Sequence, residues 1–85
     1  MTSRGAEILS TFTQLERQIA GLICRGKKNP EIALALNVPC YIVKNHLKGV
    51  FDKAGVDCRV QFVCVCAEFE MFDFDLERER ERETA

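Results

Sequence analysis

Three polar residues, Lys44, Asn45 and Lys48, lie in a stretch with helical periodicity. Asn45 follows Lys44 by one position and Lys48 follows it by four. On a helix, those offsets put the three side chains along one edge, within about one turn. Lysine can donate to guanine O6 or N7, and asparagine can pair with adenine N6 and N7. The pattern therefore favours contact with the base edges of a nucleic acid. The alternative is an ordinary solvated helix surface.

Two predicted helices position this edge. The first runs from about residue 29 to residue 36, with Asn29 as its N-cap and Pro30 at its first helical position. Asn37 ends it, because asparagine tolerates the left-handed conformation that a short turn needs. The second helix runs from about residue 39 to residue 54 and ends at Gly55. Its apolar stripe comprises Val43, Leu47, Val50, Phe51 and Ala54.

A further helix precedes this pair. It begins at Thr13, where Thr13 and Glu16 have the spacing of a capping box, and it ends at Gly26. Two helices joined by a tight corner, the second with a basic outer face, form the pattern of a helix-turn-helix.

These motifs together resemble the LuxR/GerE-type DNA-binding domain of bacterial transcription regulators. The resemblance covers residues 12 to about 66. The matching motifs are Phe12-Thr13-x-x-Glu16-Arg17, Gly26-x-x-Asn29-x-Glu31-Ile32-Ala33, Leu36-Asn37-Val38, Val43-Lys44-Asn45-His46-Leu47 and Gly55-Val56-x-x-Arg59-x-Gln61. The resemblance implies an all-α, four-helix fold whose third helix enters the major groove of double-stranded DNA. It also implies that Lys44, Asn45 and Lys48 read bases.

Four more residues complete the predicted DNA-binding set. Lys28 and Asn29 lie in the loop and helix start that face the DNA edge, Tyr41 can reach the DNA backbone or sugar, and His46 matches the family motif. The chain departs from the family pattern at Pro39, where a Ser or Thr N-cap is usual, and at Ile42, where a phosphate-contacting Thr is usual. Arg59 is predicted to bind a carboxylate or a helix carbonyl rather than DNA.

Composition sets the class of protein. The chain has 85 residues, enough for one domain with a modest core, and 47% of them are apolar. It has no apolar run of about 18 residues and no signal-peptide pattern, so we expect a cytoplasmic protein and no membrane partner. The five cysteines are expected to be reduced. No nucleophile–base pair or metal-ligand cluster is evident, so we expect no enzyme activity, no metal and no cofactor.

Charge is distributed unevenly along the chain. Residues 13–62 hold eight basic and four acidic residues, whereas residues 63–85 hold three basic and eight acidic ones. A basic body is suited to DNA, and the acidic segment accounts for the overall net charge of −1.

The fourth helix is predicted to begin at the N-cap Asp57 and to continue to about Phe72. It is apolar on all sides, which one small body cannot bury, so a second chain is implied. Val60, Cys64 and Ala67 form the predicted homodimer edge. Residues 1–11 are predicted to be a weakly ordered lead with one helical turn. Residues 12–72 are predicted to form the helix-turn-helix domain, and residues 73–85 a charged, frayed tail. We expect a protein that stands alone rather than a piece of a longer chain.

Two functional hypotheses follow from this sequence. The first is a homodimeric, sequence-specific DNA-binding transcription regulator with the helix of residues 39–54 in the major groove. The second is a LuxR-like protein-interaction module that pairs with another transcription regulator and binds DNA weakly or not at all. The altered residues Pro39 and Ile42, the apolar fourth helix and the acidic tail permit the second.

Overall fold

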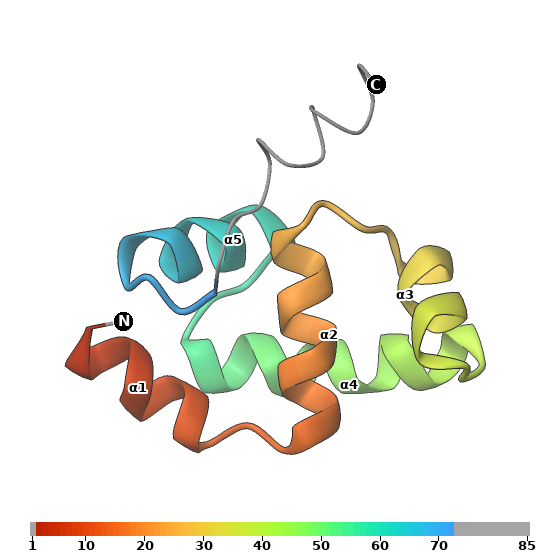
Figure 1. The fold of residues 1–85 in the computed structure, drawn as a ribbon, viewed down its shortest axis with the longest axis horizontal. Helices are drawn as coiled ribbons and strands as arrows, with labels where there is room; N and C mark the ends of the chain where they lie inside the picture. The colour runs from red at the N-terminus through yellow and green to blue at the C-terminus, as the bar shows by residue number, and fades with distance from the viewer. Residues whose placement is uncertain (1, 73–85) are drawn as a thin grey trace, which may run out of the picture.

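The computed structural model describes residues 2–72, and within this range all regular structure is helical. The helices are α1 (Ser3–Ser10), α2 (Gln14–Cys24), α3 (Asn29–Leu36), α4 (Cys40–Ala54) and α5 (Arg59–Glu68). In Figure 1, α4 runs horizontally across the lower half of the molecule and α2 crosses it, while α3 lies at one end of α4 and α5 and α1 lie at the other. α2 contacts α3, α4 and α5. The predicted all-α helix-turn-helix fold is confirmed.

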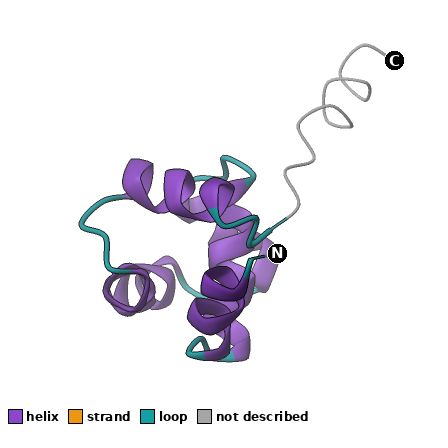
Figure 2. Ribbon diagram, turned by 90° about the vertical axis from the view of Figure 1, so that its left-hand side faces the viewer, coloured by secondary structure: helices purple, strands orange, loops and turns teal. Residues whose placement is uncertain are grey.

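The core lies where these helices meet. Its fully buried members come from α2, α3, α4 and α5: Ile19, Ile23, Ile32, Val43, Val50, Phe62 and Cys66. Phe62 packs between the rings of Phe12 and Phe51, with ring centroids 6.5 and 5.5 Å apart. Figure 2 shows the same helices from the side, joined by short loops.

The corner between α3 and α4 forms as the sequence predicts. Asn37 adopts a left-handed conformation with φ 56°, and the N–H of Val38 donates to the carbonyl of Ala33 at 3.0 Å. These are the hydrogen bond and the conformation of a Schellman motif, which ends a helix tightly. α4 ends in the same way at Gly55, with φ 73°. The corner therefore fixes where α4 starts and which of its faces meets α3.

Two predicted N-caps are wrong by one residue. The N-cap of α3 is Lys28, whose backbone N–H donates to Oε1 of Glu31 at 2.9 Å, so Asn29 is already inside the helix. The N-cap of α5 is Cys58 and not Asp57. The backbone N–H of Asp57 donates instead to Oε1 of Gln61 at 2.9 Å. In both cases a side chain inside the helix reaches back to satisfy the backbone before it.

The end of α5 also differs from the prediction. The helix stops at Glu68 rather than near Phe72, because Glu70 turns to φ 52° and the N–H of Met71 donates to the carbonyl of Cys66 at 2.9 Å. This reversal brings Met71 into the core, where it is 3% exposed. A left-handed residue other than glycine costs about 1–2 kcal/mol, and burial of the Met71 side chain offsets that cost.

Residues expected to be a weakly ordered lead form α1, a helix added to the four predicted. Thr2 caps it, its hydroxyl accepting from the N–H of Gly5 at 3.0 Å, and Ile8 and Leu9 are buried. The N–H and the hydroxyl of Thr2 both donate to the carbonyl of Phe69, at 3.2 and 3.3 Å. Contacts with the end of α5 thus order this segment. The predicted charged tail, 73–85, lies outside the described residues.

Candidate nucleic-acid interface

The predicted recognition edge lies on the solvent side of α4. Lys44, Asn45 and Lys48 are exposed, whereas Val43 and Val50 of the same helix are fully buried. α2 and α3 pack against the buried side. α4 therefore presents two cations and an amide on a helix whose other side is fixed in the core.

Tyr41 and His46 occupy different environments on α4. Tyr41 is 61% exposed, at the beginning of the helix, so its ring and hydroxyl are open to a ligand. His46 is half-buried, as expected of a residue beneath the groove-facing surface. Tyr41 is the more exposed of the two, so His46 offers less of its side chain for contact with a ligand.

Lys28 and Asn29 come from the start of α3. Lys28 is exposed, and Asn29 is half-buried. Oδ1 of Asn29 accepts a hydrogen bond from Nη2 of Arg59. That bond uses the amide oxygen and leaves the NH₂ group as the part that can donate to a phosphate.

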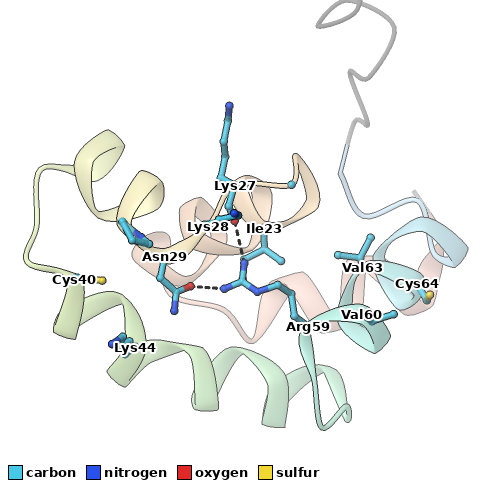
Figure 3. A pocket seen from close by; sticks show the side chains of 12 residues that line it. Ile23, Lys27, Lys28, Asn29, Cys40, Lys44, Arg59, Val60, Val63 and Cys64 are labelled. Atoms are coloured by element: carbon cyan, nitrogen blue, oxygen red, sulfur yellow. Dashed lines mark hydrogen bonds between the residues drawn. The ribbon is translucent and has the colours of Figure 1, made fainter.

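Arg59 connects α5 to the loop before α3. Besides Asn29, its guanidinium donates through Nη1 to the backbone carbonyl of Lys27 at 3.0 Å (Figure 3). The sequence predicted a structural partner for this arginine, and the partners are a backbone carbonyl and an amide oxygen rather than a carboxylate. Arg59 therefore orients Asn29 and the loop that carries Lys27 and Lys28.

A groove of about 760 Å³ brings several of these residues together. Lys27, Lys28 and Asn29 lie on one side of it, Lys44 lies on α4, and Val60, Val63 and Cys64 lie on α5 (Figure 3). Its walls are mostly apolar, with cations around them. Lys28, Asn29 and Lys44, predicted from separate motifs, thus share one surface, whereas Asn45, Lys48, Tyr41 and His46 do not line it.

The sequence missed an ion pair that holds α4 to α2. Nζ of Lys53 lies 2.6 Å from Oε1 of Glu16, and Glu16 is 5% exposed. The same carboxylate completes the capping box predicted at Thr13, with the Thr13 N–H donating to it at 2.7 Å. Burial alone would raise the pKa of Glu16, but the hydrogen bonds from Lys53 and Thr13 and the charge of Lys53 outweigh burial and lower it. Capping predicted the role of Glu16, but no local pattern links it to Lys53.

Gly49 makes room for this carboxylate. A Cβ at position 49 would lie 3.3 Å from Oε2 of Glu16. Glu16 therefore fits against α4 at Gly49 and binds Lys53 one turn later. The result is an ion pair, called the charged anchor below, that joins Glu16 of α2 to the C-terminal half of α4.

The predicted dimer edge is exposed along α5. Val60 is 72% exposed, and Cys64 and Ala67 are also exposed, whereas Phe62 and Cys66 on the opposite side are fully buried. Cys64 and Cys66 thus face opposite directions, as their spacing predicts. Cys66 instead meets Cys24 in the core, and this thiol contact together with burial raises the pKa of Cys66. The described residues contain no group of three potential metal ligands.

The two departures from the family pattern have different surroundings. Pro39 caps α4 in an extended conformation and supplies no side-chain hydrogen bond. Ile42 is half-buried, so part of its side chain faces solvent beside the exposed Tyr41. Positions 39 and 42 therefore carry no hydroxyl group, and the exposed hydroxyl at the start of α4 is that of Tyr41.

The family model for bacterial regulatory proteins of the luxR family, GerE, matches residues 10–66. This match spans all of α2, α3 and α4 and most of α5. The chain belongs to this luxR family. It thus carries the DNA-binding helix-turn-helix domain of a family of transcription regulators.

Individual relatives of this luxR-family chain are much longer proteins. It is 39% identical over 54 residues to the HTH-type transcriptional regulator MalT of Yersinia pestis (strain Pestoides F), an alignment covering 64% of the chain and 6% of that protein. The MalT of Yersinia pseudotuberculosis serotype O:3 gives the same values. MalT of Klebsiella pneumoniae is 40% identical over 47 residues, covering 55% of the chain and 5% of MalT. The chain thus matches only about one-twentieth of the length of these curated relatives.

No solved structure matches the chain significantly. Among the described residues, none of the helices is both long and apolar enough to cross a membrane.

Proposed function

We propose that this luxR-family domain binds double-stranded DNA sequence-specifically, with α4 in the major groove, and so regulates transcription. The observation that carries the proposal is the exposed row of Lys44, Asn45 and Lys48 on a helix whose opposite side is fully buried. A recognition helix needs both properties, because base contacts require side chains held in a fixed register. Lys28, the NH₂ of Asn29 and the exposed Tyr41 would bind the DNA backbone beside it.

We further propose that two copies associate through the edge formed by Val60, Cys64 and Ala67. A two-fold dimer through α5 would place two α4 helices in successive major grooves, about 34 Å apart. The exposed part of this edge is small, so association in solution would be weak and DNA would reinforce it. The regulator would act in the cytoplasm. Its proposed role is to bind DNA rather than to catalyse a reaction.

The test is a fluorescence-anisotropy titration of the full chain against a duplex selected from a randomised library, repeated across salt concentrations. We expect the double variant Lys44→Ala/Lys48→Ala to bind more weakly. The log–log salt slope falls by about 1.8 if both lysines touch phosphates, whereas base contacts instead cost about 1–3 kcal/mol of discrimination per pair. Arg4→Ala, on the far helix α1, is the matched control and leaves binding unchanged. A double variant with wild-type affinity and preference would contradict the proposal.

A second candidate function is supported by the start of α4. Pro39 offers no capping side chain, and Ile42 cannot donate a hydrogen bond, while Val60 on α5 is 72% exposed. This combination suits a module that pairs with another transcription regulator and binds DNA weakly. The same titration, run with and without candidate regulators, separates the two functions: tight binding to the selected duplex by the chain alone supports the first.

A further inference from the structure

The groove shared by Lys28, Asn29 and Lys44 also has the dimensions of a small-molecule site. Its volume of about 760 Å³ lies within the range typical of pockets for organic ligands. The wall that α5 supplies is apolar, with Val60 and Val63 one helical turn apart (Figure 3). An occupant with an apolar body would remove this wall from water, whereas the phosphates of a DNA backbone would leave it without an apolar partner.

The charge of this groove is one-sided. Four cations are among the residues that line it: Lys27, Lys28, Lys44 and Arg59. None of the described residues that line it is acidic, and within the 2–72 range none of the four cations forms an ion pair. Charge complementarity therefore points to an anion as the occupant.

Arg59 lies in the middle of the groove, between Asn29 on one side and the α5 wall on the other (Figure 3). It is half-buried, and the two acceptors that it binds, the carbonyl of Lys27 and Oδ1 of Asn29, are both neutral. These bonds use two of the five N–H groups of the guanidinium, so three remain for a ligand. A partly buried cation whose partners are neutral is stabilised by an anion, and the planar guanidinium matches the two oxygens of a carboxylate.

We propose that this groove binds a small organic carboxylate with an apolar body. The carboxylate would accept hydrogen bonds from Arg59, and the body would pack against Val60 and Val63. Lys28 and Lys44 would add electrostatic attraction at the rim. Because these two lysines also belong to the proposed DNA contact, a bound carboxylate would compete with a duplex, and this consequence alone rests on the proposed function.

The test is a titration of the full 85-residue chain with phenylbutyrate, followed by nitrogen–proton correlation NMR. It contains no DNA, so its result is independent of the proposed function. Phenylbutyramide has the same body without the charge, and acetate has the same carboxylate without the body. We expect phenylbutyrate to shift the amide signals of residues 27–29 and 59–64 saturably, with a Kd at least about tenfold lower than for either control compound. Equal affinity for a control compound, or no saturable shift below about 10 mM, would overturn the proposal.

Two variants locate the ligand. Arg59→Gln removes the central charge, and Val60→Asp places an anion on the apolar wall, so each should raise the Kd for phenylbutyrate at least about tenfold. Val60 is exposed, so Val60→Asp remains a test even if Arg59→Gln does not fold. Leu34→Asp is the matched control, since Leu34 is an exposed apolar residue that does not line this groove, and its Kd should equal that of the wild type. Wild-type affinity in either folded groove variant would overturn the proposal.

Discussion

α4 and α5 lie side by side in the fold, but they divide their surfaces differently. α4 is apolar towards the core and carries Lys44, Asn45 and Lys48 outside, whereas α5 buries Phe62 and still exposes Val60. A helix with a polar outer side is well solvated without a partner, and its charged side chains remain free to bind a charged ligand. A helix that is apolar on both sides is stabilised further by an apolar partner. The proposed DNA contact and the proposed self-association therefore fall on different helices.

The two sides of α5 can be separated by truncation. Phe62→Ala should destabilise the domain by about 3–5 kcal/mol, because it leaves a cavity between Phe12 and Phe51. Val60→Ala, two residues earlier but 72% exposed, should change the unfolding free energy by less than about 0.5 kcal/mol. Urea unfolding at low protein concentration measures both. Similar losses for the two variants would show that Val60 is part of the core.

The charged anchor formed by Glu16 and Lys53 makes the free energy of unfolding depend on pH. Because the pKa of Glu16 lies below its ordinary value of 4.5 in the folded protein, the ionised carboxylate adds stability above that value. This stability is lost as pH falls through the lower, folded pKa. Glu16→Gln should cost about 1–2 kcal/mol at pH 7, near the low end for charged hydrogen bonds because the Lys53 side chain is 35% exposed and regains water.

Urea unfolding of wild type and Glu16→Gln from pH 7 down to pH 2 checks this. The difference between the two proteins should shrink below about pH 4.5. Glu31→Gln is the control, since that exposed carboxylate caps α3 and forms no ion pair with another residue of the 2–72 range. A difference that is constant with pH would mean that the Glu16 charge contributes nothing.

The outer edge of α5 is the side on which an added charge should weaken the proposed self-association. Cys64→Asp places an anion on the proposed two-fold interface, where like charges from two copies would meet, so self-association should weaken at least about tenfold. The variant should remain folded, because Cys64 is exposed. Cys64→Ser, polar but neutral, is the matched control. Sedimentation equilibrium decides: a wild type that is monomeric up to millimolar concentration excludes this dimer.

The smallest expected effect concerns the start of α4. Ile42→Thr should strengthen DNA binding by about 1 kcal/mol, the size of one typical hydrogen bond, if the half-buried side chain faces a phosphate. The measurement is the same anisotropy titration, with Ile42→Val as the control of equal branching and no hydroxyl. A variant that loses stability without gaining affinity would show that Ile42 serves packing alone.

The sequence was informative wherever a helix end is determined locally. Thr13 with Glu16, Asn37 and Gly55 carry their own signals, so the boundaries of α2, α3 and α4 were predicted within a residue or two. The predicted exposure of Lys44 and Lys48 followed from the same periodicity, since the 3.6-residue repeat fixes which side of α4 faces the core.

The errors occurred where distant residues decide the structure. α1 is short and depends on Ile8 and Leu9 reaching a core built from later helices, so its own eight residues gave little signal. The end of α5 is determined by the burial of Met71, which overrides the left-handed penalty at Glu70. Likewise, Glu16 and Lys53 are 37 positions apart, and only the folded chain brings them together.

The hydrogen bonds from Thr2 to Phe69 have a consequence for the order of folding. They join residues 67 positions apart, and closing a free loop of that size costs about 4 kcal/mol of chain entropy. Two hydrogen bonds contribute roughly 1–3 kcal/mol, so they cannot bring the ends together unaided. The helices between them must already be packed when this contact forms. The junction of Thr2 and Phe69 is therefore among the last contacts made during folding and among the first to open.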